Sequence, residues 1–223
     1  ILNDTGDLKM LKTLIDFAAT LNLPLSQKQA EQMLSYANLV WNKKDFLNLT
    51  SAADLNEVLT RHICDGLTAA AKINGFIHAK KMVSPQAADV GAGAGYIGIT
   101  TALALPHVQV TLVESIEKRC SFMNWAIMQL GIKNTKVKQA RLGQGTAFAF
   151  DFVTERAMGQ LPDILEICLG ALKAGGVFIA YQGEHPQADM CRPEKCQGTL
   201  LGVERYHLPD DNKKRHLVLF GKM

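Results

Sequence analysis

The sequence lacks any long apolar stretch, since no uninterrupted run approaches the roughly 20 residues that a membrane helix requires. It also lacks a basic-then-apolar segment of the kind that directs secretion near its first residues. We therefore expect a soluble, cytoplasmic protein that makes no contact with a membrane.

Cysteine is scarce. The five cysteines are Cys64, Cys120, Cys168, Cys191 and Cys196. An odd number of scattered cysteines favours free thiols over a disulfide framework. Cys191 and Cys196 are separated by four residues and follow His185, but no second ligand pair stands at metal-site spacing. We expect no metal site.

The sequence also lacks a large excess of one charge, with 24 Lys and Arg residues against 21 Asp and Glu residues and a net charge of +3. That balance does not by itself indicate a polyanionic partner. The basic residues form short clusters at Lys43-Lys44, Lys80-Lys81, Lys118-Arg119, Lys133 to Lys138 and Lys213 to Arg215. If these clusters lie on one face of the molecule, they could follow a phosphate backbone. If they are dispersed, they are ordinary solvated helix ends and loops.

There are no internal repeats or low-complexity tracts, and an apolar fraction of 48% argues against disorder. With 223 residues the chain can form one α/β domain with an appended piece, or two small domains.

The first part of the chain is predicted to be helical. Apolar residues recur at helical spacing over 7–21, over a segment that starts after Ser26 and ends near 42–44, and over a third helix capped by Asp54. Residues 75–86 are predicted to be a connection, and they hold the one candidate boundary. We expect a helical extension, residues 1–75, that packs on a Rossmann-like domain, residues 76–223.

The remaining chain alternates between strands and helices. Strands are predicted at 87–90, 109–113, 136–138, 150–154 and 177–181, and helices at 96–105, 117–130 and 162–172. This alternation predicts an α/β fold, a mostly parallel sheet with helices on both faces. Two last strands, 199–208 and 215–221, flank the turn-rich residues 209–212 and predict a C-terminal antiparallel hairpin.

Residues 88–98, ADVGAGAGYIG, link the first strand to the next helix. Asp89 precedes three alternating glycines, Gly91, Gly93 and Gly95, which suit a sharp turn with backbone N–H groups facing a ligand. Glycine also fits a tight turn that binds nothing. Glu114 ends the second strand, where an acid can hold ribose hydroxyls or stand as an exposed carboxylate.

Two families share such a turn and acid: nicotinamide-binding Rossmann domains and S-adenosylmethionine-dependent methyltransferases. The alternating glycines Gly91, Gly93 and Gly95, with Asp89 two residues before the first, are spaced in the methyltransferase style, and a terminal antiparallel hairpin also belongs to the methyltransferase sheet. Both features favour a class I methyltransferase with S-adenosylmethionine as cofactor.

The chain further resembles the GidB/RsmG family of 16S rRNA guanine-N7 methyltransferases. The motifs that carry the resemblance are Trp41-Asn42-Lys43, Asn48-Leu49-Thr50-Ser51, Arg61-His62 with Asp65, the glycine turn ending in Gly98, Glu114-Ser115 with Lys118-Arg119, Phe152-Val153-Thr154 before Arg156-Ala157, and Arg215-His216-Leu217-Val218. Their order and spacing together, along nearly the whole chain, are specific to this family.

The resemblance implies a role for each site residue. Gly91 and Tyr96 border the methionine and ribose end of the cofactor, Glu114 holds the ribose, and Leu142 and Gly143 adjoin the adenine. Arg156 lines the cofactor or target-base side, where a guanidinium can donate to guanine O6, or else it forms a structural salt bridge. Guanine N7 needs no deprotonation before it attacks a methyl group, so positioning suffices and no general base is expected.

Other motif residues are expected to support the site. Arg61, His62 and Asp65 stand on the third predicted helix, where Arg61 and Asp65 share a face and could pair. Asn48 and Thr50 either shape the pocket rim or bond their own loop. Lys118, Arg119 and Arg215 are expected on the supporting or substrate side, with rRNA or the small ribosomal subunit as partner of a monomer.

Several residues depart from the family pattern. Ile97 replaces a proline, Gly66 and Glu155 each replace a serine, Gly143 replaces an acid, and Gln182 replaces a lysine. Losing a lysine and gaining Glu155 shifts an RNA-facing pocket toward negative charge. The alternatives are a methyltransferase of the same fold acting on another RNA or a small molecule, a non-catalytic RNA-binding assembly factor and, more remotely, a nicotinamide oxidoreductase.

Overall fold

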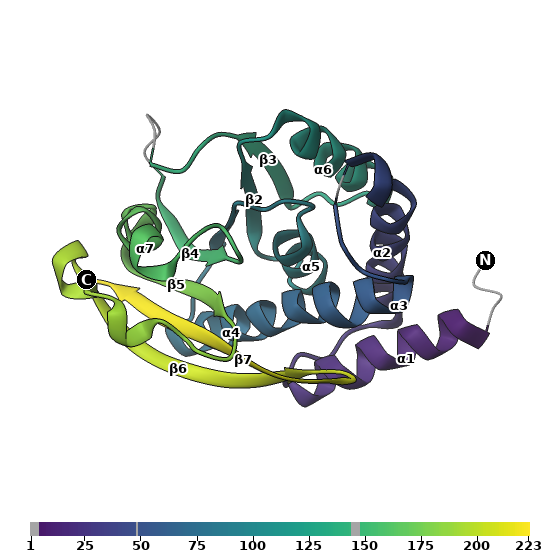
Figure 1. Cartoon of the computed structure of the whole chain (residues 1–223), viewed down its shortest axis with the longest axis horizontal. Helices are drawn as coiled ribbons and strands as arrows, with labels where there is room; N and C mark the ends of the chain where they lie inside the picture. Colours follow the sequence, from purple (N-terminus) through teal and green to yellow (C-terminus); the bar gives the residue numbers. More distant parts are fainter. Residues whose placement is uncertain (1–4, 48, 144–147) are drawn as a thin grey trace.

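A seven-stranded sheet organises the molecule, in the strand order β3-β2-β1-β4-β5-β7-β6 (Figure 1). The computed structural model describes residues 5–47, 49–143 and 148–223. The strands are β1 (Gln86–Val90), β2 (Gln109–Glu114), β3 (Thr135–Gln139), β4 (Phe150–Glu155), β5 (Leu172–Gln182), β6 (Gly198–Leu208) and β7 (Asp211–Lys222). Strands β1 to β5 pair in parallel, and β7 runs antiparallel to both β5 and β6. The predicted fold class is confirmed.

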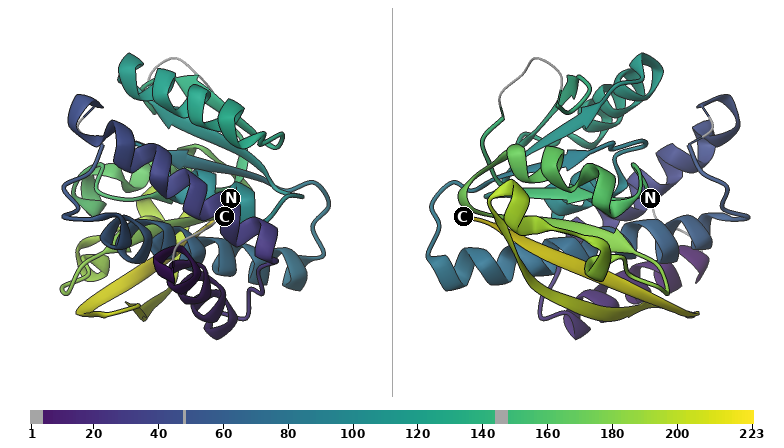
Figure 2. Two further views of the ribbon diagram at one scale, coloured as in Figure 1. Left: turned by 90° about the vertical axis from the view of Figure 1, so that its right-hand side faces the viewer. Right: turned by 60° about the vertical axis from the view of Figure 1, so that its left-hand side comes forward.

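Helices cover both faces of this sheet (Figure 2). They are α1 (Thr5–Thr20), α2 (Gln27–Leu47), α3 (Leu55–Val58), the π-helical segment η1 (Leu59–Ile63), α4 (Cys64–Lys80), α5 (Tyr96–Ala104), α6 (Glu117–Leu130) and α7 (Leu161–Gly170), followed by the short 3₁₀ turns η2 (Ala188–Met190) and η3 (Pro193–Cys196). The predicted caps are present, because the Ser26 hydroxyl accepts from the Gln29 amide at 3.3 Å and the Asp54 carboxylate accepts from the Glu57 amide at 2.7 Å.

Alternate residues of each strand enter two separate cores. Ala87 and Phe152 face α4, α5 and the N-terminal helices, whereas Ala88 and Val153 face α7. Helices α1, α2 and α4 therefore share one continuous core with the sheet (Figure 2).

Helix α4 is longer than predicted. The segment expected as a connection over 75–86 is helical as far as Lys80, because Ile73 and Ile77 continue the buried face across the exposed Gly75. The helix ends at Lys81, whose φ is +50°. The division at residues 75 and 76 thus falls inside α4.

The C-terminal hairpin is tighter than predicted. Its turn is Pro209 and Asp210 alone, with φ of +55° at Asp210, and β7 already begins at Asp211. Both strands are consequently long, and they lie along α4 near the end of α1 (Figure 1).

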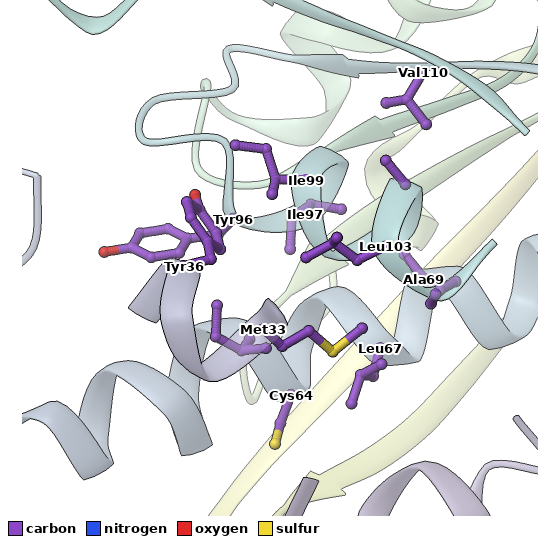
Figure 3. Close-up of a cluster of buried hydrophobic side chains, with 14 of the residues drawn as sticks. Met33, Tyr36, Cys64, Leu67, Ala69, Tyr96, Ile97, Ile99, Leu103 and Val110 are labelled. Carbon is purple, nitrogen blue, oxygen red and sulfur yellow. The ribbon is translucent and has the colours of Figure 1, made fainter. Parts of the chain in front are cut away.

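The contact between α2, α4 and α5 sets the position of the glycine turn. Met33, Leu67 and Leu103 fill the space between these helices (Figure 3). At one edge of the cluster the buried Tyr36 hydroxyl donates to the carbonyl of Ala94 at 2.6 Å. The N-terminal helices therefore hold the turn directly.

Among the described residues, no helix combines the length and apolar character needed to cross a bilayer.

Candidate active site

The turn between β1 and α5 has the backbone that its glycines predict. Gly91, Gly93 and Gly95 have φ of +64°, +61° and +89°, a region that other residues rarely occupy. A Cβ on Gly91 would also lie 3.2 Å from the Met158 side chain. The turn is thus restricted to glycine by its conformation.

Asp89 braces this turn from below. Its buried carboxylate accepts from the Gly98 amide at 2.9 Å and from the Thr154 hydroxyl at 3.2 Å. Burial raises the pKa of Asp89 to about 6, against those hydrogen bonds and the Arg156 charge. Asp89 also contributes to the cavity wall described below.

Glu114, at the end of β2, is buried and binds three backbone amides. One oxygen accepts from Gly93 at 2.9 Å, and the other accepts from Ser115 at 2.8 Å and Ile116 at 2.9 Å. The alternative interpretation of Glu114, an exposed carboxylate at the end of a strand, is therefore excluded. Glu114 connects the ends of two adjacent strands at the mouth of the turn.

Two chambers meet above the carboxyl ends of the strands. The larger, about 570 Å³, is lined by Leu49, Thr50, Ser51, His62, Asp89, Gly91, Ala92, Gly93, Ala94, Tyr96, Ile97, Arg119, Arg156 and Ala157. The smaller, about 280 Å³, is lined by Gly91, Val113, Glu114, Ser115, Ile116, Arg119, Ala140, Arg141, Leu142, Ala157 and Met158. Gly91, Arg119 and Ala157 belong to both walls, so the chambers adjoin across the glycine turn.

Aromatic rings form one side of the larger chamber. The Tyr96 ring stacks on His62, with centroids 4.3 Å apart and planes 18° apart. His62 Nε2 lies 3.1 Å from the Thr50 hydroxyl, which also accepts from the Ala52 amide at 3.0 Å. Thr50 therefore lies on the rim of the chamber and also bonds its own loop. The sequence had left these two interpretations as alternatives.

These groups are uncharged at neutral pH. Burial, with a smaller contribution from the nearby Arg156 charge, lowers the pKa of His62 to about 3. Burial raises the pKa of Tyr96 to about 12. A neutral imidazole and a neutral phenol therefore line this wall.

Arg156 is both a wall residue and a salt-bridge partner. Its Nη1 donates to Asp65 Oδ2 at 2.8 Å, and its guanidinium carbon lies 5.5 Å from the centroid of the Tyr96 ring. A guanidinium has five N–H donors, and this bond uses one. The sequence left two alternatives for Arg156, a salt bridge and a place in the cavity wall, and this side chain does both.

The expected pairing of Arg61 with Asp65 is wrong. Arg61 pairs instead with Glu57, and Asp65 is only 1% exposed. Glu57 lies one helical turn before Arg61 and takes its guanidinium, whereas the Asp65 carboxylate bonds Arg156 and Tyr206. Arg61 consequently faces outward while Asp65 points toward the site.

The remaining predicted residues fall into four groups. Arg119 lies on both chamber walls, with Nη1 3.6 Å from Glu114 Oε2, and Leu142 lines the smaller chamber. Gly143, at φ +84°, and the exposed Lys118 are not among the lining residues. Arg215 donates to Asp211 at 2.6 Å, behind the site. Asn48 lies outside the described residues.

The departures from the family pattern have local explanations. A Cβ at Gly66 would lie 2.5 Å from Thr100 Cβ, so a larger neighbour fills the space of the missing side chain. Gln182 bonds the Tyr181 carbonyl at 3.0 Å and lines neither chamber.

The expectation that Glu155 adds negative charge to the pocket needs correction. This side chain is only 1% exposed, accepts from the Met158 amide and lines neither chamber. Burial raises its pKa to about 7, so the carboxyl is partly protonated at neutral pH.

Sequence reasoning missed three contributors. Tyr36 was hidden in the apolar face of α2, and Met158 follows the arginine motif without a signal of its own. Ala157 lies where the chambers meet with φ of +65°, a strained conformation for alanine that no sequence pattern announces. No group of three or more His, Cys, Asp or Glu side chains that could hold a metal occurs in the part of the chain that the structure describes.

The sheet order, the glycine turn closed by a strand-end acid and the paired chambers define a class I methyltransferase dependent on S-adenosylmethionine. The same fold is found in a magnesium protoporphyrin IX methyltransferase from Synechocystis, solved with SAH bound. That structure has a TM-score of 0.58 at 12% identity, with 84% of this chain and 100% of that chain covered.

The particular family is identified from sequence. The family described as rRNA small subunit methyltransferase G, or GidB, matches residues 29–218, and the chain belongs to it. It is similar to relatives named ribosomal RNA small subunit methyltransferase G. One from Clostridium botulinum is 32% identical over 92% of this chain and 87% of the relative. Another from Neisseria meningitidis is 31% identical over 92% of this chain and 94% of the relative.

Proposed function

We propose that the protein transfers the methyl group of S-adenosylmethionine to N7 of a guanine in small-subunit rRNA. Family membership supports this substrate class. The observation that carries the proposal is the pair of adjoining chambers, with Glu114 in one wall and Arg156 in the other. They provide separate places for a nucleoside and for a target base on either side of the glycine turn.

The residues present fit the cofactor. A carboxylate has about four lone-pair sites, and backbone amides use three of those on Glu114, which leaves one on Oε2 for a ribose hydroxyl. Val113, Ile116 and Leu142 give the smaller chamber an apolar lining suited to an adenine ring. Gly91, Gly93 and Tyr96 would then border the methionine end.

The protein's part in the reaction is to position the cofactor and the target base. When bound, the cofactor supplies an electrophilic methyl group on a sulfonium. Arg156 would donate to guanine O6 and leave the N7 lone pair directed at that methyl. Because His62 and Tyr96 are neutral, these two side chains add no cation beside the sulfonium, and the Arg156 guanidinium in the same wall is paired with Asp65.

The same proposal extends to assembly and location. We propose that the protein acts as a monomer, since all residues of both chambers come from one chain. An rRNA substrate would place it in the cytoplasm with the ribosome. Light scattering of the purified protein tests the monomer, and a dimer mass would reject it.

Two measurements test the function. Calorimetric titration with S-adenosylhomocysteine should show one site, and the absence of heat would reject the cofactor.

Small subunits from a strain deleted for this gene should accept labelled methyl at one guanine, mapped by primer extension after cleavage at N7-methylguanine. Incorporation only into another RNA or a small molecule would favour a different substrate for the same fold. RNA binding without incorporation would favour an assembly factor.

Arg156→Lys tests the role of the guanidinium. Lysine keeps the positive charge but loses the planar set of donors. We therefore expect turnover to fall about 10²-fold, while the affinity for S-adenosylhomocysteine changes little. Arg192→Lys is the matched control, because Arg192 is exposed and bonds only nearby backbone carbonyls. Equal turnover in the two variants would show that Arg156 does not position the target base.

A further inference from the structure

Asp65, on helix α4, receives contacts from three other segments of the chain. Its Oδ2 accepts from Arg156 at 2.8 Å, and its Oδ1 accepts from the hydroxyl of Tyr206 at 2.7 Å. Arg215 Nη1 lies 3.9 Å from Oδ2. The Asp65 carbonyl accepts from the Tyr181 hydroxyl at 2.6 Å. The arginine motif after β4, strand β5 and the C-terminal hairpin therefore converge on one residue of helix α4.

Burial makes these contacts necessary. With 1% exposure Asp65 has almost no contact with solvent, so protein donors must replace the water that would solvate its charge. A single bond to Arg156 would leave the second oxygen without a partner and the carboxylate free to turn about its last torsion. The Tyr206 hydroxyl occupies that second oxygen and fixes the plane of the carboxylate.

Tyr206 is itself held firmly. On β6 it stands opposite Arg215 of β7 in the antiparallel register, and its ring meets the Tyr181 ring edge to face, with centroids 6.3 Å apart and planes at 85°. The hydroxyl is consequently presented to Asp65 by two paired strands and a packed ring.

We propose that Tyr206 is a positioning residue for methyl transfer, which orients Arg156 through the Asp65 carboxylate. This inference rests on the proposed function of Arg156. Tyr206 lines neither chamber and touches the Asp65 oxygen that Arg156 does not use. Its effect therefore passes through Asp65 and changes the direction of the guanidinium.

Tyr206→Phe removes the hydroxyl and keeps the ring. We expect kcat to fall between about 5- and 50-fold, because a misdirected Arg156 aligns the target base less often, while the KM for the cofactor changes less than about twofold. Glu204→Gln is the matched control. Glu204 is on the same strand and pairs with Lys72 of α4, but it does not touch Asp65. Its rate should equal that of the wild type.

A double-mutant comparison tests the route. In an Asp65→Asn background, Tyr206→Phe should change kcat by less than about twofold, since the group through which it acts is already altered. An equal fall in both backgrounds, or a wild-type rate for Tyr206→Phe alone, would overturn the proposal.

A spectroscopic readout separates this inference from the proposed function. The guanidinium nitrogen resonances of Arg156, assigned by their loss in Arg156→Lys, should show slow rotation in the wild type and faster rotation in Tyr206→Phe. This result is expected even if rRNA proves not to be the substrate. Unchanged resonances would reject the positioning role whatever the reaction.

Discussion

At the scale of single residues, three buried acids beside the site differ in what neutralises them. Asp65 faces a guanidinium and a phenol, Glu114 faces three backbone amides with the Arg119 guanidinium 3.6 Å away, and Asp89 faces one amide and one hydroxyl. A charged donor stabilises a carboxylate more than a neutral one. The poorest set of donors belongs to Asp89, and its pKa is raised by burial accordingly.

Glu114→Gln should weaken cofactor binding. A carboxamide has only one oxygen, so its NH₂ group would face a backbone N–H and distort the turn that borders the cofactor. We expect the dissociation constant of S-adenosylhomocysteine to rise about 10- to 100-fold, a change that calorimetry resolves.

Glu117→Gln provides the control for that change. Glu117 is exposed at the start of α6, three positions away, and the same charge is removed. Equal affinities of the two variants for S-adenosylhomocysteine would show that Glu114 has a structural role and does not contribute to cofactor binding.

At the scale of elements, the close packing of α5 on the sheet fixes the geometry of the turn. A Cβ on Gly98 would lie 2.1 Å from Leu112 Cδ2 and 2.9 Å from Asp89 Cβ. Helix α5 can approach β1 and β2 this closely only without a side chain at this position. That approach also allows the Gly98 amide to reach Asp89.

Gly98→Ala should therefore destabilise the fold by about 1–3 kcal/mol, since the crowded neighbours are a strand side chain and the bracing acid. Gly75→Ala is the matched substitution in α4, where no atom lies within 4 Å of the new Cβ. It should stabilise the protein by about 0.5–1 kcal/mol through helix propensity. Urea unfolding measures both, and a shared sign would contradict the packing argument.

The elements were largely predictable because their signals are local. The alternation of strands and helices, the caps at Ser26 and Asp54 and the glycine turn each depend on residues within a few positions. The failures occurred where a local rule was overridden. Arg61 pairs with Glu57 because distant residues occupy the Asp65 carboxylate, and buried isoleucines carried α4 past Gly75.

Contacts between distant residues were beyond reach of the same reasoning. The Arg156–Asp65 bond joins positions 91 residues apart, and the Tyr206–Asp65 bond joins positions 141 apart. Family resemblance indicated which residues matter in the first pair but not that they meet. Tyr206 carried no motif, since a tyrosine in an alternating strand is ordinary sheet composition.

At the scale of the whole molecule, buried titratable groups act on stability in opposite directions. Burial raises the pKa of Glu155 to about 7, so the unfolded chain releases this proton more readily and stability falls as pH rises from about 4.5 to 7. Burial lowers the pKa of His62 to about 3, so the unfolded chain takes up a proton first and stability falls as pH decreases below about 6.5. Asp89 acts in the same direction as Glu155.

Glu155→Gln should remove one of these dependences. We expect its free energy of unfolding to exceed that of the wild type by about 1–3 kcal/mol at pH 8 and to differ by less than about 0.5 kcal/mol at pH 4. Denaturant unfolding across this range is the measurement, with the exposed Glu194→Gln as control. A constant difference at all pH values would show that the carboxyl of Glu155 does not titrate as described.

The C-terminal hairpin has a consequence for the order of synthesis. A ribosome completes α4, the glycine turn and Arg156 well before it reaches Tyr206 and Arg215, the side chains that complete the surroundings of Asp65. Strand β6 is also made before β7, the strand that lies between it and β5. The nascent chain therefore carries Arg156 and Asp65 without their full set of fixed neighbours until about residue 215 has been made, so the surroundings of this pair cannot form during synthesis of the first half of the chain.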